Sequence, residues 1–292
     1  NHTIRKITPA GVVSTIGGGA GAAGTTNGAA SVARLNAPLS IAASRDGSTI
    51  YLTDASHTVR RLAADGSVTL IAGATNTAAF ADGAATEARF NTPSGLALET
   101  SGALWVSDTL NQVMRRISPA GLVSTVAGLP GTSGYVNVDG KGTDARFRSP
   151  LGISLAPDGA LWVADASNHR IRRVTSDATV ATLAGTNNWG SNDGNGSNAW
   201  FDTPNAVVVD SLGEGYVADT NNNLVRVVTV NGDVTAIAGS DVAAASTDGA
   251  GRNARFNAPR GIAIDAAGVI YIADSGNHTI RRFGPAGGVA FT

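Results

Sequence analysis

The 292-residue sequence contains no cysteine, which excludes disulfides and thiolate chemistry. Of its 21 basic residues only two are lysine, and of its 22 acidic residues only three are glutamate; the rest are arginine and aspartate. Lysine and glutamate are the usual surface residues of helices, so their scarcity argues against a helical fold. The net charge is −1 without a basic run, and no run of 18 apolar residues occurs. We therefore expect neither nucleic-acid binding nor membrane insertion.

What the sequence does have is glycine, 37 residues of it, and one phrase that recurs five times. The phrase reads WVADASNHRIRRV at 162–174 and YIADSGNHTIRRF at 271–283. The aspartates that mark its five copies are Asp54, Asp108, Asp165, Asp219 and Asp274. Their spacings of 54, 57, 54 and 55 residues indicate a repeat protein.

Four short segments, rich in valine, isoleucine, leucine or aromatic residues and bounded by turn formers, surround each aspartate in constant order. They predict four strands, a to d, with short turns between a and b and between c and d. A loop of about 20 residues leads to the next unit. Four antiparallel strands every ~55 residues predict an all-β fold, a β-propeller whose blades stack face to face. Trp105 and Trp162 share one position of strand b with a tyrosine in the other units, so we expect both in the core.

The phrase at 271–283, preceded by ARFNAPRGIAID, also resembles the NHL repeat, named after an Asn-His-Leu core. The core is present as Asn1-His2, Asn168-His169 and Asn277-His278, with degenerate forms at Asn111-Gln112 and Asn222-Asn223. The resemblance covers the whole chain and implies a β-propeller. It leaves the function open, because NHL propellers include scaffolds, RNA binders, surface proteins and a few lyases.

The repeat also predicts the domain organisation. We expect a single propeller over residues 1–292, with full blades at 37–73, 93–128, 150–185, 204–239 and 259–292 and a half-blade of strands c and d at 1–17. Six blades with one incomplete is the main expectation, and five-bladed closure is the alternative. An isolated hairpin is marginally stable and its edge invites pairing. We therefore expect residues 1–17 to pair with another copy or with another part of a longer parent chain, rather than with the C-terminal blade.

Polar residues that recur once per unit have structural interpretations. The four histidines, His2, His57, His169 and His278, share one repeat position, so they are spread around a ring and cannot surround one metal ion. The recurring aspartates are expected to accept backbone N–H groups in turns. The arginine pairs of strand c are expected to pack their stems between blades while their heads reach water or aspartate.

A second repeated phrase, DGKGTDARF at 139–147, lies in each long loop and could supply calcium ligands such as Asp139 and Asp144. It lacks the alternating acidic pattern of an EF-hand. The favoured interpretation is a glycine turn whose phenylalanine packs on the blade, and no cofactor is expected.

Residues that break the repeat are the candidate ligand-binding residues. Because strands alternate in direction, the b–c loops and the long d–a loops share one face, where binding residues would gather. The candidates are Tyr135, Lys141, Trp189, Trp200, Asn221, Asn222 and Asn223. Exposed aromatic rings beside asparagine and aspartate are typical of glycan and protein sites.

No catalytic cluster is confined to a single blade. The sequence therefore favours a non-catalytic interaction or scaffold propeller, extracellular or on the cell surface and part of a larger protein or assembly, that binds a protein or a glycan. The alternative is an enzyme of the propeller lyase or lactonase type, with a metal ion on its axis.

Overall fold

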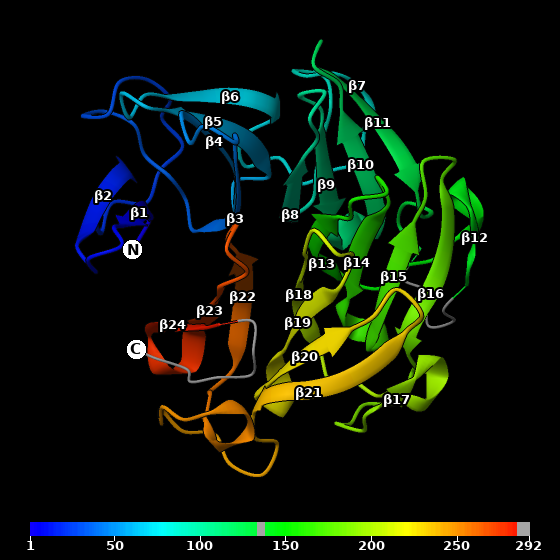
Figure 1. Cartoon of the computed structure of the whole chain (residues 1–292). Helices are drawn as coiled ribbons and strands as arrows, with labels where there is room; N and C mark the ends of the chain where they lie inside the picture. The colour runs from blue at the N-terminus through cyan, green and yellow to red at the C-terminus, as the bar shows by residue number, and fades with distance from the viewer. Residues whose placement is uncertain (133–137, 285–292) are drawn as a thin grey trace. The chain divides into compact units, whose positions relative to one another are not determined.

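The computed structural model describes residues 1–132 and 138–284 (Figure 1). The chain divides into two compact units, Asn1–Val126 with Pro130–Thr132, and Ala127–Leu129 with Ser133–Thr292. All helices in the described residues are 3₁₀ turns of three residues, which confirms the all-β prediction. None of these turns has the length or the apolar character needed to span a bilayer.

The first unit contains three antiparallel sheets. The two-stranded sheet consists of β1 (Thr3–Ile7) and β2 (Val13–Gly18). The four-stranded sheet consists of β3 (Pro38–Ala43), β4 (Thr49–Asp54), β5 (Thr58–Ala63) and β6 (Val68–Gly73). The five-stranded sheet consists of β7 (Gly83–Ala84), β8 (Pro93–Leu98), β9 (Leu104–Asp108), β10 (Val113–Ile117) and β11 (Leu122–Ala127), with η1 (Thr109–Asn111) between β9 and β10.

The second unit also contains three sheets. The first consists of β12 (Gly140–Lys141), β13 (Pro150–Leu155), β14 (Leu161–Asp165), β15 (Arg170–Val174) and β16 (Thr179–Gly185), with η2 (Gly142–Asp144) and η3 (Ala166–Asn168). The second consists of β17 (Gly194–Asn195), β18 (Pro204–Val209), β19 (Gly215–Asp219), β20 (Leu224–Val228) and β21 (Asp233–Gly239), with η4 (Gly196–Asn198) and η5 (Thr220–Asn222). The third consists of β22 (Pro259–Ile264), β23 (Ile270–Asp274) and β24 (Thr279–Phe283), with η6 (Gly251–Asn253) and η7 (Ser275–Asn277).

Four of the five larger sheets contain the strand order a-b-c-d predicted for propeller blades, and the described part of the last has a-b-c. Strand d of the last blade, expected within 285–292, lies outside the described residues. The described sheets are five blades and one separate hairpin, which supports the five-bladed alternative and not the six-bladed arrangement. The hairpin has only the two strands predicted for residues 1–17 and makes no sixth full blade.

Three blades have a fifth strand that the sequence analysis assigned to a loop, so the prediction of four strands was wrong there. The dipeptides of β7, β12 and β17 pair antiparallel with the start of strand d, as Gly140 does with Val180. Each dipeptide follows the aspartate of the Asp-Gly phrase. Two of the three dipeptides begin with a glycine at positive φ, 134° at Gly83 and 157° at Gly194, a conformation that glycine adopts readily.

Within each unit, successive sheets pack face to face. In the first unit, Ile4 of β1 joins Leu52 and Leu62 of the next sheet in one buried cluster. In the second unit, Trp162 packs with Val217 of the following blade. Trp162 is 1% exposed and Trp105 is 8% exposed, which confirms both as core residues.

The hairpin β1–β2 therefore packs its face on the sheet β3–β6 of its own chain. Ile4 is buried, Ile16 is half-buried against the same cluster, and Val12 is 61% exposed. The strand pairing expected from the sequence stays a prediction, because a hairpin can bury one face without pairing its edge.

Candidate functional site

The first arginine of each strand-c pair is buried between two polar partners. In the blade β12–β16, Arg172 donates from Nη1 to Asp165 at 2.9 Å and from Nη2 to Asp139 at 2.7 Å. Arg172 and Asp165 have no exposed side-chain surface. The ring centroid of Phe147 lies 5.3 Å from the Arg172 guanidinium carbon. The blade thus neutralises a cation inside its own fold.

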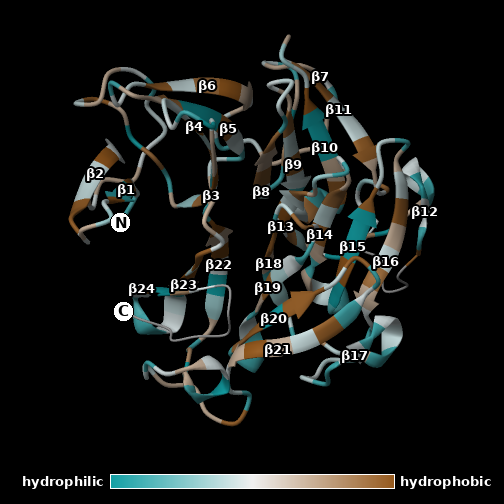
Figure 2. Cartoon of the chain, viewed as in Figure 1, coloured by the Kyte–Doolittle hydropathy of each residue, from teal (hydrophilic) through white to brown (hydrophobic). Residues whose placement is uncertain are grey.

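The same arrangement recurs in the other four blades. The arginines are Arg60, Arg115, Arg226 and Arg281, paired with Asp54, Asp108, Asp219 and Asp274. In four blades the aspartate of the Asp-Gly phrase lies 33 residues before the arginine that it binds. In the first blade, Asn27 stands at the position of this aspartate. Figure 2 shows hydrophilic, teal stretches on β10 and β15, the strands that carry Arg115 and Arg172. The expected contact with aspartate is confirmed, but the full burial of these guanidinium groups was not predicted.

The strand-end aspartates accept backbone N–H groups as predicted. Oδ1 of Asp165 accepts the N–H of Arg148 at 2.7 Å, and Oδ2 accepts Nδ2 of Asn168 at 3.0 Å. Burial raises the pKa of Asp108 and of Asp219 to about 6, while hydrogen bonds and the charge of the paired arginine oppose that rise. Both carboxylate oxygens of Asp165 are therefore occupied by donors of the fold itself.

The recurring histidine links one blade to the next. Nδ1 of His169 accepts the backbone N–H of Thr203 at 3.1 Å, and His57 does the same for Thr92 at 3.0 Å. Asn223 stands at this position in the next blade, and its Oδ1 accepts the N–H of Ala258 at 2.8 Å. A ring nitrogen occupied in this way is a structural acceptor, in agreement with the interpretation made from the sequence.

The structure separates the predicted asparagine run into different roles. Asn222 donates to Asp219 at 2.8 Å and to the carbonyl of Gly190 at 2.6 Å, so it belongs to the repeated cluster. Asn223 links blades, as described above. Asn221 is exposed and donates to Asp202 at 3.2 Å.

Trp200 and Trp189 also differ. Trp200 replaces an arginine that donates to its own loop in the other blades, and an added Cβ at Gly190 would lie 2.7 Å from its ring. Trp200 is thus a half-buried packing residue. Trp189 is 69% exposed, although its backbone forms an isolated parallel β-bridge with Phe201. Of the two candidates, only Trp189 presents its ring to solvent.

The loop of Trp189 contacts the next long loop of the same unit. Oγ of Ser191 donates to Asp241 at 2.5 Å, and Asp241 pairs with Arg252 at 3.3 Å. Val242, beside Asp241, is 88% exposed. We call the set Trp189, Ser191, Asp241, Val242 and Arg252 the Trp189 surface. Four of them could not be recognised from the sequence, because their significance depends on a contact between two loops that are distant along the chain.

Two other candidates lie elsewhere. Lys141 is on β12 and pairs with Asp177 of the c–d turn at 3.2 Å, so it is not on the predicted face. Tyr135 lies outside the described residues. The calcium candidates do not form a free pair of carboxylates, since Asp139 binds Arg172 while Asp144 is exposed on η2.

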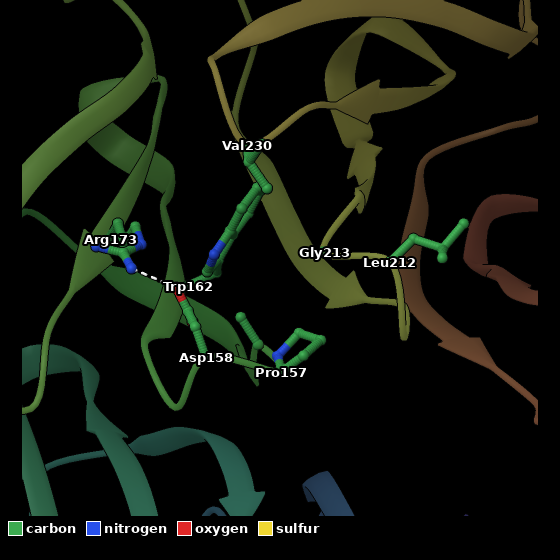
Figure 3. A pocket seen from close by; sticks show the side chains of 8 residues that line it. Pro157, Asp158, Trp162, Arg173, Leu212, Gly213 and Val230 are labelled. Atoms are coloured by element: carbon green, nitrogen blue, oxygen red, sulfur yellow. Dashed lines mark hydrogen bonds and ion pairs between the residues drawn. The ribbon is translucent and has the colours of Figure 1, made fainter.

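A pocket of about 320 Å³ lies by the a–b and c–d turns of the second unit. Figure 3 shows Arg173 paired with Asp158 beside the Trp162 ring, and Val230 and Leu212 are among the other lining residues. The first unit has a similar groove of about 250 Å³, which includes Tyr51, at the position equivalent to Trp162. A groove that recurs between blades is a consequence of packing, and it gives no reason to prefer this face.

Comparisons with known proteins agree with the repeat. The NHL repeat family model matches residues 147–174 and 256–283. NHL repeat-containing protein 2 of Bos taurus is 31% identical over 241 residues, which cover 70% of this chain and 32% of that protein. Teneurin-4 of Mus musculus is 25% identical over 225 residues, covering 68% of this chain and 8% of that protein. The chain thus spans about a third or less of these relatives.

Solved structures share the fold at lower identity. Virginiamycin B lyase from Staphylococcus aureus superimposes with a TM-score of 0.58 at 18% identity, over 88% of this chain and 70% of the lyase. An auxiliary nutrient binding protein from Bacteroides thetaiotaomicron gives 0.60 at 18% identity, over 89% and 72% of the two chains. The repeated blades and these matches lead to one conclusion: the chain is a β-propeller protein built from NHL repeats.

Proposed function

We propose that this chain is a non-catalytic interaction module that binds a protein or a glycan through the Trp189 surface. The observation that carries the proposal is the exposed indole of Trp189 on a loop anchored by the bridge to Phe201. An exposed indole on a rigid support can stack on a sugar ring or fill a pocket of a protein partner. Asp241 and Arg252 beside it supply acceptors and donors for the polar groups of such a ligand.

A non-catalytic role is supported by the use of the recurring polar residues. The aspartates and arginines neutralise each other inside the blades, and His57 and His169 accept backbone N–H groups. Among residues 1–132 and 138–284, no three side chains of His, Asp or Glu are grouped so that they could hold a metal ion. The polar groups that recur most often thus serve stability.

The test is a glycan array combined with a pull-down on the purified chain, followed by affinity measurements on whichever ligand binds. Trp189→Ala should weaken binding by about tenfold or more, as expected for a central aromatic anchor. Leu212→Ala is the control, because Leu212 is 83% exposed on an a–b turn. Equal binding by the wild-type chain and Trp189→Ala would contradict the proposal.

The competing function is an enzyme of the lyase type. Its support is the likeness to virginiamycin B lyase, which at 18% identity concerns the fold. Elemental analysis of the purified chain distinguishes the two functions. A stoichiometric metal ion bound by residues from several blades, together with turnover of virginiamycin B, would show that the chain is an enzyme and not an interaction module.

The proposal includes a location outside the cell or on its surface, within a larger protein or assembly. The length of the relatives supports the larger protein alone, since Teneurin-4 is covered to only 8%. Detection of the native protein in surface and secreted fractions, and its size on denaturing gels, would test both points. Detection only inside the cell would exclude this location.

A further inference from the structure

The pocket of about 320 Å³ in the second unit, which we call the Trp162 groove, differs in its chemistry from the groove of the first unit. Each lies between adjacent blades of one unit, so the shared shape follows from the repeat. Ten residues of the described chain line the first-unit groove, and none of them is charged. The Trp162 groove instead includes the ion pair of Arg173 and Asp158 (Figure 3). This pair is a polar corner in a lining that is otherwise apolar or glycine.

The indole of Trp162 forms a fixed base for the groove. An added Cβ on Gly215 would lie 2.8 Å from Cε3 of the ring, so the indole occupies the room of a missing side chain. At the position of Gly215 the blade β7–β11 has Leu104, which lines the first-unit groove. Trp162 also packs in one buried cluster with Val217. A ligand would therefore meet a wall that is already ordered, which lowers the cost of binding.

Asp158 already uses both of its carboxylate oxygens. Oδ1 accepts the backbone N–H of Ala160 at 3.0 Å, and Oδ2 accepts Nη2 of Arg173. These two bonds lower the pKa of Asp158, so the carboxylate stays charged at neutral pH. Asp158 thus contributes a negative charge to the groove, but its hydrogen bonds go to the fold itself.

Arg173 keeps donors that its counterpart in the first unit has used. Arg116 binds Glu99 through both Nε and Nη2, each at 2.7 Å. Arg173 binds Asp158 through Nη2 alone, and its Nε and Nη1 donate to no group within residues 1–132 and 138–284. The side chain is 35% exposed, so these donors can be reached. The polar corner therefore calls for a ligand that supplies a hydrogen-bond acceptor.

Volume and charge narrow the class of ligand. A volume of about 320 Å³ is at the lower end of the roughly 300–1,000 Å³ of small-molecule pockets, which favours a compound of one or two rings over an oligosaccharide. A ligand carboxylate on Arg173 would lie close to the carboxylate of Asp158, and like charges at a binding site cost affinity. A neutral carbonyl oxygen accepts the same hydrogen bond without that repulsion.

We propose that the Trp162 groove binds a small neutral carbonyl compound, an ester, ketone or amide with an apolar body of one or two rings. The carbonyl oxygen accepts a hydrogen bond from Arg173, and the apolar body covers Pro157 and the half-open side of Val230, which is 59% exposed. Leu212 is directed away from Trp162 at the rim (Figure 3). The site belongs to the a–b and c–d turns and is independent of the Trp189 surface.

The test is equilibrium dialysis of the purified chain against methyl naphthoate, naphthalene and naphthoate. We expect saturable 1:1 binding of the ester. Naphthalene should bind about tenfold more weakly, because it lacks the acceptor for a hydrogen bond from a charged group. Naphthoate should also bind more weakly than the ester, because Asp158 repels it. Tighter binding of naphthoate than of the ester would overturn the assignment of a neutral ligand.

Variants of the ion pair make the test specific for the groove. Arg173→Met should bind the ester and naphthalene equally, whereas Arg116→Met, the matched change in the first unit, should keep the tenfold preference. Asp158→Asn retains the acceptor for Ala160 and removes the charge, so this variant should bind naphthoate more tightly than the ester. Thermal unfolding checks that each variant is folded. Absence of saturable ester binding, or a folded Arg173→Met chain that still prefers the ester tenfold, would overturn the proposal.

Discussion

The guanidinium of Arg172 and the carboxylate of Asp165 lie 2.9 Å apart, and neither side chain has any exposed surface. They are seven positions apart along the chain, and the b–c turn brings them together. The adjacent Arg173 points the other way, is 35% exposed and pairs with Asp158. Two consecutive arginines thus have opposite environments, as the period of two in a β-strand requires.

Arg172→Met should destabilise the chain by roughly 3–5 kcal/mol, because it leaves Asp165 buried without its cation. Arg173→Met is the matched control and should cost less than about 1 kcal/mol, since its ion pair is solvated. Urea unfolding of both variants measures the difference. Similar losses for the two would mean that burial of the first arginine does not decide its contribution.

Strand order and blade boundaries could be predicted because period-two alternation and turn residues recur five times. Recurring aromatic positions such as Trp162 also identified the core. The 33-residue spacing between Asp139 and Arg172, constant in four blades, could have revealed the buried ion pairs. The Trp189 surface could not have been found in this way, because the contact of Ser191 with Asp241 depends on how two irregular loops fold.

His169→Asn should retain nearly full stability, whereas His169→Ala should lose about 1 kcal/mol or more. Asparagine already performs this role at Asn223, where φ is 55°, close to the 54° of His169. Asparagine tolerates this left-handed conformation and offers an acceptor, while alanine offers no acceptor and is strained. Thermal unfolding at pH 8 gives the comparison. An alanine variant as stable as the asparagine variant would show that the hydrogen bond to Thr203 contributes nothing.

The same histidine should make stability depend on pH. Burial lowers the pKa of His169 below its ordinary value of 6.5, although the carboxylate of Asp202 opposes this shift. A base with a lowered pKa in the folded state stabilises the fold fully above pH 6.5, and this contribution is lost as the pH falls through the folded-state pKa. His169→Asn should remove that component. If the difference in free energy of unfolding between the wild type and His169→Asn stays constant from pH 8 to pH 5, this pH dependence is contradicted.

Gly215→Ala should destabilise the chain by about 1–3 kcal/mol, because the added methyl group meets the Trp162 ring. An added Cβ would lie 2.8 Å from Cε3 of the indole and closer still to Cζ3. Other blades carry leucine or isoleucine at this position, as at Leu161 and Ile270. Tyrosine lacks the second ring, so Trp162→Tyr in the Gly215→Ala background should recover part of the loss. A double-mutant cycle with no coupling would show that the two residues do not compensate each other.

Glu99→Gln should reduce stability at neutral pH by roughly 0.5–1 kcal/mol, and the loss should disappear in acid. The carboxylate of Glu99 accepts two hydrogen bonds from Arg116, both at 2.7 Å, and these lower its pKa from 4.5 to about 2. A carboxyl group with a lowered pKa in the folded state contributes fully above the unfolded value of 4.5, and the contribution declines as the pH falls towards 2. Glu87→Gln is the control, since Glu87 is exposed in the same unit without an ion pair in the described residues. Urea unfolding at pH 7 and pH 3 measures the free energy of unfolding of both variants, and the difference between them should be smaller at pH 3. A larger difference at pH 3 would mean that the pKa of Glu99 is not lowered in the folded state.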